Sequence, residues 1–387
     1  MSAPSSLNRP PILLLTVQIY GKAGGVPAYS RRIAEILSGY AEQEGRPLSC
    51  VSFGDTAADP ARHSRPVRYA SFAGVRGNRG QFLRQAFSIA RGRRGGLAVV
   101  AHLGQSPVAW ILRSLGLIRN YIVVLHGVEA WNRVDWLDRI ALRRAAAIVA
   151  TTHFTAKRFA ELNQIPLSLV RVIPLALDLD EASVPPLPPQ ADTLRILSVG
   201  RIAAAERYKG FETLIEAVKI LRDRHVPAML TIVGTGDDVP TLREIRDRLD
   251  LGDSVQLPGE VSSAELENQF RDCDVFALPS KGEGFGIVFL EAMRWAKPCI
   301  GGNHGGTPEV IVDGATGFLV EHGDAKVVAD RLMDLYRDPE LRKSTGQSGF
   351  ERVRAEYLYP RMRDRWLALL ADMDLGAKGT SSNGMNG

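Results

Sequence analysis

Short apolar runs alternate with amphipathic stretches along most of the 387 residues, and this alternation predicts the fold class. A helix is expected at about 27–37, after the first run and its glycine-rich turn. Runs that are apolar throughout are typical of parallel strands covered on both faces. In the first half of the chain, such strands are predicted at residues 12–17, 97–102, 121–126, 146–151 and 169–173.

Four prolines between Val184 and Pro189 interrupt the alternation and predict a stiff linker at residues 184–191. Beyond it the alternation restarts, with helices at 211–222 and 240–249. The second set of strands is predicted at 194–200, 229–234, 275–279, 298–301 and 317–320. We therefore predict an α/β fold with two doubly wound, Rossmann-like parallel-sheet domains, at 1–183 and 192–358, facing a central cleft.

The composition is that of a globular protein, with 45% hydrophobic and 24% charged residues. Three scattered cysteines favour a reducing compartment over a disulfide framework or a zinc site. No apolar run reaches eighteen residues, and we interpret residues 12–20 as a buried strand, not a signal-peptide core. We expect a cytoplasmic protein whose first eight residues and tail, 376–387, are disordered.

The net charge of +5 hides an asymmetry. Residues 1–190 hold 23 Lys and Arg against 12 acids, and residues 191–387 hold 25 against 31. Residues 61–128 contain eleven arginines and no acid, which predicts an anionic partner. Two helical stretches here place Arg beside Phe82, Phe87, Trp110, Ile111 and Leu112. Either this face docks on an anionic membrane, or the apolar stripe faces the core; no nucleic-acid-binding module is present.

The segment 283–293 carries the most specific signal: Glu283, a Gly-x-Gly bend, and Glu291 inside an apolar helix. Backbone N–H groups at such a bend suit phosphate, and carboxylates suit sugar hydroxyls. Eight helical residues rise about 12 Å, more than the separation of a glycosidase pair. The two acids are therefore interpreted as binding groups for the two ends of one long ligand. Taken singly, Glu291 is also compatible with a core carboxylate, and Glu283 with an exposed loop acid.

Two cations follow the first strand of the second half. Arg201 directly follows that strand, and Lys209 precedes the next helix, so together they could neutralise a diphosphate. His126 ends a strand of the first half, where it contacts either the sugar or only the protein. The Asp272-Cys273-Asp274 string is not taken as a metal site, because no further acid or His cluster accompanies it. No metal and no cofactor are expected.

Five segments together resemble the retaining glycosyltransferases of family four, which have the GT-B architecture. They are Gly24-Gly25-Val26, Ser198 to Arg201, Lys209-Gly210, Pro279 to Met293, and Gly305 to Ile311 with the following 314–320. The gap between Arg201 and Lys209 is longer than in many members. The resemblance also implies that a C-terminal helix at 361–375 joins the first domain.

The resemblance implies a role for each matching residue. Arg201 and Lys209 would hold the diphosphate, Glu283 the sugar hydroxyls and Glu291 the ribose, while His126 would lie near the transferred sugar. The remaining donor contacts would come from Gly24, Gly25, Val261, Gly284, Phe285, Gly286 and Ile287.

The implied reaction transfers a sugar from a UDP- or GDP-sugar to an acceptor hydroxyl with retention of configuration. The acceptor would be a saccharide or lipid-linked saccharide of bacterial polysaccharide or lipopolysaccharide synthesis, met at the inner face of the cytoplasmic membrane. Sugar-nucleotide 2-epimerases share the architecture and are the alternative.

Overall fold

The computed structural model describes residues 9–21, 24–62, 67–177, 185 and 192–379, of which 61, 62 and 375–379 are described by their backbone alone. The chain divides into two compact units. Unit 1 comprises Met1–Leu175 with Pro360–Gly387, and unit 2 comprises Ala176–Tyr359. Except for Pro185, the expected linker at 184–191 lies outside the described residues, as do residues 1–8 and 380–387.

Unit 1 contains a seven-stranded sheet in the order β3-β2-β1-β4-β5-β6-β7, and every neighbouring pair is parallel. Its strands are β1 (Ile12–Thr16), β2 (Leu48–Ser52), β3 (Ser71–Gly74), β4 (Gly96–Val100), β5 (Ile118–Leu125), β6 (Ala147–Ala150) and β7 (Val170–Val172). The strand order reverses direction between β1 and β4. In such sheets, ligands bind at the carboxyl edge beside that reversal.

The helices of unit 1 cover both faces of this sheet. They are α1 (Gly25–Gln43), α2 (Arg79–Gly92), α3 (Ser106–Ser114), α4 (Trp136–Arg144), α5 (His153–Asn163) and α13 (Tyr359–Gly379). Leu13 and Leu15 of β1 share one core cluster with buried residues of α2, α3, α4 and α5. On the other face, the Tyr29 hydroxyl of α1 donates to the Ile173 carbonyl at 2.8 Å.

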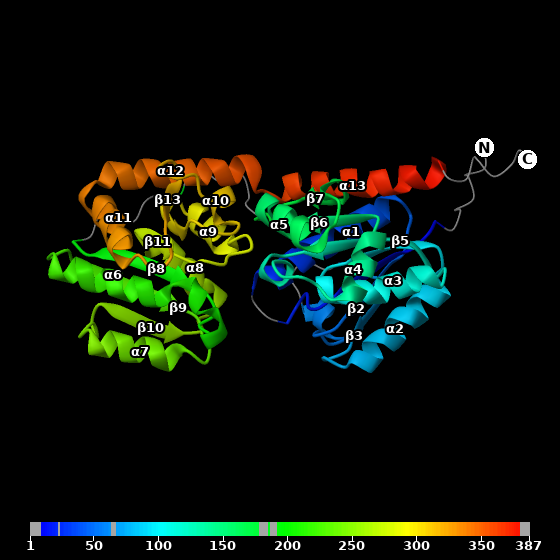
Figure 1. The fold of residues 1–387 in the computed structure, drawn as a ribbon, viewed down its shortest axis with the longest axis horizontal. Coiled ribbons are helices and arrows are strands. Elements are labelled where there is room, and N and C mark those ends of the chain that lie inside the picture. The colour runs from blue at the N-terminus through cyan, green and yellow to red at the C-terminus, as the bar shows by residue number, and fades with distance from the viewer. Residues whose placement is uncertain (1–8, 22–23, 63–66, 178–184, 186–191, 380–387) are drawn as a thin grey trace, which may run out of the picture. The chain divides into compact units, whose positions relative to one another are not determined.

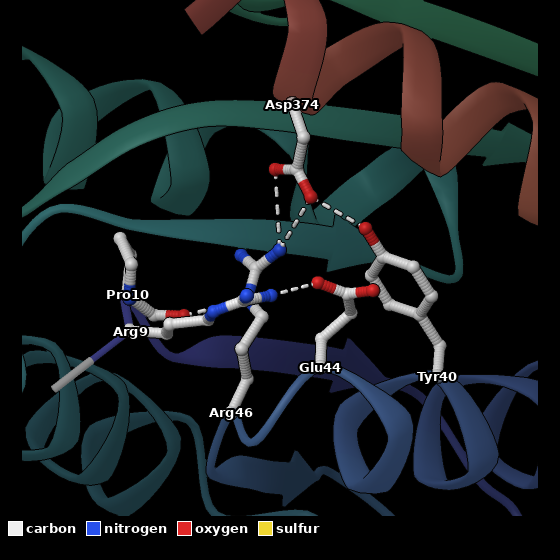
Figure 2. A network of polar contacts seen from close by, with 6 residues as sticks. All are labelled: Arg9, Pro10, Tyr40, Glu44, Arg46 and Asp374. Carbon is white, nitrogen blue, oxygen red and sulfur yellow. Dashed lines mark hydrogen bonds and ion pairs between the residues drawn. The ribbon is translucent and has the colours of Figure 1, made fainter. Parts of the chain in front are cut away.

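The C-terminal helix α13 packs on unit 1, with Trp366 fully buried. Figure 2 shows how α13 is tied to α1 and to the turn after it. Asp374 accepts hydrogen bonds from the Tyr40 hydroxyl and from Nη1 of Arg46, the latter at 2.9 Å. Nε of the same guanidinium donates to the Pro10 carbonyl at 2.6 Å. Arg46 and Asp374 also line a cavity of about 510 Å³ at the amino edge of the sheet.

Unit 2 repeats the architecture with six parallel strands in the order β10-β9-β8-β11-β12-β13 (Figure 1). The strands are β8 (Leu194–Val199), β9 (Ala228–Val233), β10 (Val255–Gly259), β11 (Val275–Leu278), β12 (Cys299–Gly302) and β13 (Gly317–Val320). The order here reverses direction between β8 and β11. The predicted α/β class, with two doubly wound parallel sheets, is confirmed.

The helices of unit 2 connect and cover these strands. They are α6 (Phe211–Asp223), α7 (Val239–Arg248), α8 (Ser263–Asp272), α9 (Ile287–Met293), α10 (Thr307–Val310), α11 (Ala325–Arg337) and α12 (Pro339–Glu356). Right-handed crossovers place α6 on one face of the sheet and α9 on the other. Accordingly, α6 packs beside α11, and α9 packs beside α12.

The strands β2, β3 and β10 escaped the sequence-based prediction. Their segments contain Ser, Gln, Pro or Gly, and β3 is only partly buried, so none of them reads as a continuous apolar run. The helix expected at 27–37 extends to Gln43, and α13 extends to Gly379, into the expected tail. No helix in the described part of the chain combines the length and apolar character needed to cross a membrane.

Candidate functional site

The loops that follow β8 and β11 meet at the carboxyl edge of the unit 2 sheet. These two strands are neighbours, although three helices and two strands separate them in sequence. Because both strands run the same way, the residues after Val199 and after Leu278 emerge side by side. This juxtaposition brings the predicted cations and the first predicted carboxylate into one site.

Lys209 and Glu283 form an ion pair at the centre of this site. Lys209 ends the 3-10 helix η5 (Ala204–Lys209), and its Nζ lies 3.0 Å from Oε1 of Glu283. Only about 15% of the Lys209 side chain and 14% of the Glu283 side chain are exposed to solvent. A pair shielded to this degree attracts more strongly than a surface pair, yet solvent still reaches it.

Close backbone packing holds the two loops together. Gly210 has φ 79°, and a Cβ there would lie 2.6 Å from the carbonyl oxygen of Pro279, in the β11 loop. The amide of Lys281 donates to the carbonyl of Tyr208 at 2.7 Å. Burial raises the pKa of the Tyr208 hydroxyl, and the nearby Glu283 carboxylate adds to the rise, so this phenol stays protonated at neutral pH.

Arg201 is the second residue after β8, on the loop that leads to η5, and its side chain is 71% exposed. It pairs with Glu206. The loop is held from the β9 side, because a Cβ on Gly234 would lie 1.9 Å from the carbonyl oxygen of Gly200. The close packing of Gly234 against Gly200 therefore helps to position the Arg201 loop.

Glu291 lies in α9, whose residues Phe289, Leu290, Ala292 and Met293 are fully buried. Burial raises the pKa of the Glu291 carboxyl to about 7, with Arg294 partly opposing the rise. Within the described part of the chain, no hydrogen bond or ion pair reaches this carboxylate. A partly buried carboxyl without a partner is costly in isolation, and a ligand that supplies hydroxyl donors would relieve that cost.

The Gly-x-Gly bend between the two glutamates is buried, and Gly286 is followed directly by Ile287, the first residue of α9. Phe285 packs edge-on against Tyr357, with ring centroids 5.8 Å apart. The carbonyl of Glu283 accepts a hydrogen bond from the Gly306 amide at 2.8 Å. The later Gly305-Gly306 segment therefore fixes the backbone that carries Glu283.

Val261 follows β10, at the same edge of the sheet, and is partly exposed. The next residue, Ser262, caps α8 by accepting a hydrogen bond from the amide of Glu265. The side-chain carboxylate of Glu265 in turn accepts a hydrogen bond from the Ser262 amide at 2.8 Å. This capping box sets the direction in which the chain leaves Val261.

Unit 1 places the remaining candidates at the carboxyl edge of its own sheet. His126 directly follows β5, and its ring Nε2 lies 2.7 Å from the Ala101 carbonyl oxygen. Burial lowers the pKa of His126, while Glu129 opposes that shift, so the ring is neutral at pH 7 and Nε2 carries the proton. Gly24 and Gly25 are exposed where α1 begins after β1.

The Asp272-Cys273-Asp274 string lies at the opposite edge of the unit 2 sheet, just before β11. Asp274 accepts two hydrogen bonds from the guanidinium of Arg195, both at 2.9 Å, and Asp272 pairs with Arg271. Among the residues that the structure describes, no group of three or more His, Cys, Asp or Glu side chains could hold a metal ion.

Two family profiles match the chain. The one described as glycosyl transferases group 1 covers residues 181–352, and the one described as glycosyltransferase family 4 covers residues 24–181.

Two curated relatives are matched over about three-fifths and two-thirds of their own length. The GDP-mannose-dependent alpha-(1-6)-phosphatidylinositol monomannoside mannosyltransferase of Mycobacterium tuberculosis is 31% identical over 64% of this chain and 67% of its own. The D-inositol 3-phosphate glycosyltransferase of Paenarthrobacter aurescens is 33% identical over 62% of this chain and 61% of its own.

Solved structures share the fold over nearly the whole chain. Anabaena HepE in complex with UDP has a TM-score of 0.74 at 18% identity, covering 94% of this chain and 100% of that one. Sucrose-phosphate synthase from Thermosynechococcus elongatus has a TM-score of 0.74 at 22% identity, covering 95% and 100%. Together with the relatives and the profiles, these likenesses show that the chain belongs to glycosyltransferase family four and has the GT-B fold.

Proposed function

We propose that this protein is a retaining hexosyltransferase that moves a sugar from a nucleoside diphosphate to an acceptor hydroxyl. One observation carries the proposal: a shielded Lys209–Glu283 ion pair lies at the carboxyl edge of unit 2, where α9, the helix that carries the unpartnered carboxylate of Glu291, begins. A nucleotide sugar offers each of these groups a partner. Its diphosphate suits Lys209, its sugar hydroxyls suit Glu283, and its ribose diol suits Glu291.

Binding of such a donor exchanges partners within the site. Lys209 passes from the Glu283 carboxylate to the diphosphate, and Glu283 is then free to accept hydrogen bonds from the sugar. The exposed guanidinium of Arg201 is available for the same diphosphate once it leaves Glu206. Backbone groups at Gly284, Phe285, Gly286 and Ile287, with Gly24, Gly25 and Val261, complete the donor contacts in this proposal.

The proposed chemistry needs neither a metal nor a cofactor. The bond between the anomeric carbon and the diphosphate oxygen breaks, while the bond to the acceptor oxygen forms on the same face. The acceptor proton passes to the leaving diphosphate, and Lys209 and Arg201 stabilise the negative charge that develops there. The neutral ring of His126 faces the transferred sugar and donates no proton.

The names of the relatives guide the choice of substrate. The tuberculosis relative is named as GDP-mannose-dependent and acts on a phosphatidylinositol mannoside, and HepE was solved with UDP. We therefore favour a UDP- or GDP-hexose as the donor and a lipid-linked saccharide of bacterial polysaccharide or lipopolysaccharide synthesis as the acceptor. Such an acceptor places the protein in the cytoplasm, peripherally on the inner face of the membrane.

A sugar-nucleotide 2-epimerase remains the second candidate, because it would use the same donor and architecture. It differs in needing no acceptor. Incubating the protein with each nucleotide sugar alone, and inspecting the sugar by NMR, separates the two reactions, since only an epimerase changes the configuration at C2.

Replacing Lys209 or Glu283 by Ala tests the site. Each single change should lower kcat for sugar transfer by about 10²–10³-fold, because each removes a group preorganised for the transition state. Initial rates with saturating donor and acceptor provide the measurement.

Arg207→Ala is the matched control, because Arg207 lies in the same 3-10 helix but pairs with Asp238 at 2.7 Å, and its side chain is half exposed. It should stay within a few-fold of the unsubstituted protein. Turnover near that level in both Lys209→Ala and Glu283→Ala would refute the assignment of the site.

The raised pKa of Glu291 predicts a pH dependence of donor binding. The free protein holds the proton on this carboxyl below about pH 7, whereas hydroxyl donors of a ribose favour the ionised form. KM for the donor should therefore fall by about tenfold between pH 6 and pH 8. In Glu291→Gln, KM should be higher and flat with pH; a dependence that survives the substitution contradicts the assignment to Glu291.

A further inference from the structure

The outer faces of α3 and α4 in unit 1 carry a set of exposed, large apolar side chains. Trp136 is 71% exposed and Leu115 60%, while Ile111 and Ile140 are each exposed to more than a third. Together with Leu83 of α2, which is 43% exposed, these residues define what we call the apolar face. Exposed apolar residues that are scattered singly are normal, but a cluster on adjoining helices marks an interaction surface.

The two helices lie side by side and run in the same direction (Figure 1). Near their starts, the Ser106 hydroxyl donates to Asp138 at 3.1 Å. At their ends, Arg113 donates to the Arg144 carbonyl. Leu112 and Leu142 turn inward and are fully buried. A spacing of four residues then aligns Ile111 with Leu115, the C-cap residue of α3, and Trp136 with Ile140 on the outside.

The structure corrects the residues expected to form such a face. Phe82 and Leu112 belong to the core cluster of unit 1, as the core-facing interpretation predicted. Phe87 and Trp110 are partly buried and pack against the same cluster. Of the five residues singled out from the sequence, only Ile111 is exposed, while Trp136 and Ile140 lie beyond the acid-free stretch that drew attention to this region.

The helices and loops that carry the apolar face are rich in arginine. Residues 76–144 contain twelve arginines and three acids, and hence carry a net charge of +9. Two of the acids make hydrogen bonds at the start of α4. Asp135 accepts a hydrogen bond from the Asp138 amide at 2.9 Å, and the Asp138 side chain accepts one from the Ser106 hydroxyl. The exposed arginines of this region are Arg76, Arg79, Arg84, Arg91, Arg93, Arg94, Arg119, Arg133, Arg143 and Arg144.

We propose that this face docks unit 1 on an anionic lipid bilayer. Indole and aliphatic side chains insert at the level of the lipid headgroups, and guanidinium groups pair with lipid phosphates. A second copy of this chain is a poorer occupant, because it would bring the same positive charge into the contact. The docking goes beyond the proposed reaction and specifies where a lipid-linked acceptor would be met.

Vesicle sedimentation at low salt tests the proposal. The protein should pellet with vesicles containing phosphatidylglycerol and stay in solution with pure phosphatidylcholine or in 0.5 M NaCl. Trp136→Ala should weaken binding by about tenfold or more, because it removes the largest inserted side chain. Arg84→Gln and Arg91→Gln should each weaken it by about fivefold.

Val312→Ala is the control, since Val312 is a comparably exposed apolar residue of unit 2, and it should bind as the unsubstituted protein does. Absence of binding to anionic vesicles at low salt overturns the proposal, as does unchanged binding by Trp136→Ala. So does a dimer in solution that Trp136→Ala dissociates, because the face would then join two copies. None of these readouts depends on transferase activity.

A second, independent observation concerns Asp55, which follows β2 and is fully buried. Its carboxylate accepts hydrogen bonds from three successive amides, those of Ile19 at 2.7 Å and of Tyr20 and Gly21 at 3.0 Å each. It also accepts one from the Ser52 hydroxyl at 2.6 Å. Successive amides that converge in this way form an anion-binding nest, and here the protein fills the nest with its own carboxylate.

The segment held by Asp55 is the one that leads from β1 toward Gly24, Gly25 and α1. From the other side, Nη2 of Arg31 in α1 donates to the Ile19 carbonyl at 3.0 Å. Residues 19–21 are therefore fixed from both sides, and their amides are occupied. Gly24 and Gly25, which follow at the start of α1, are exposed and could contact an anionic ligand.

We infer that Asp55 is a positioning residue that presets the Gly24–Gly25 turn for the donor diphosphate. This inference rests on the proposed function, in which that turn contacts the donor. Asp55→Asn keeps the size of the side chain but replaces one acceptor oxygen with an NH₂ group that cannot accept from an amide. KM for the donor should rise at least fivefold, because binding must then order the loop, while kcat changes less than KM.

The control is Asn163→Asp, the reverse exchange at another fully buried, backbone-bonded position of unit 1, where Oδ1 accepts from the Val134 amide at 2.9 Å. It should lower Tm without raising KM. If Asp55→Asn lowers Tm in the same way and leaves KM unchanged, Asp55 serves only stability and the inference fails. If the unsubstituted protein transfers no sugar, the proposed function fails instead.

Discussion

The candidate site depends on one ion pair, between Lys209 and Glu283. Neither residue lies on a strand or an α-helix: Lys209 ends a 3-10 helix, and Glu283 lies in the loop between β11 and α9. Their meeting follows from the topology of the sheet, because β8 and β11 are neighbours at the point where the strand order reverses. In the absence of a donor, the pair satisfies two charges that would otherwise be partly desolvated without a partner.

The same constraint explains the glycines around the pair. Gly210 must approach the Pro279 carbonyl, and Gly234 the Gly200 carbonyl, more closely than any Cβ would allow. These contacts hold the loop after β8, which carries Lys209, against the loops after β9 and β11, and the last of these carries Glu283. Glu291 differs from the pair, because its buried helix holds it without any partner of its own in the described structure. A single elongated ligand could therefore bind both the Lys209–Glu283 pair and the Glu291 carboxylate.

Much of this arrangement could be predicted from the sequence. Apolar runs, such as residues 12–15 of β1 and 121–125 of β5, predicted the parallel sheets, and the segment 283–293 predicted the candidate site. The strands β2 and β3 could not be found in this way, because Ser49, Ser52 and Ser71 break the apolar pattern and because a parallel partner stabilises them only in the folded sheet.

Hydrogen bonds and ion pairs between residues far apart in the chain could not be predicted from the sequence either. Nothing in the local pattern pairs Lys209 with a residue 74 positions away, or directs the Asp55 carboxylate to amides 34–36 positions earlier. The apolar face was misplaced for a similar reason: a stripe such as Phe82 and Leu112 has the same spacing whether it faces the core or the solvent. Only the burial of the side chains distinguishes a core-facing stripe from a solvent-facing one, and that burial depends on how the whole unit packs.

Calorimetric titration with UDP and GDP, without a sugar, tests most directly the claim that Lys209 exchanges Glu283 for a diphosphate. If Glu283 competes for Lys209, Glu283→Gln should bind the preferred nucleotide about tenfold more tightly than the unsubstituted protein, because the ammonium group is released. Lys209→Met should bind it at least tenfold more weakly. If Glu283→Gln binds no more tightly and Lys209→Met no more weakly, the ion pair is only structural, and the account of the site is wrong.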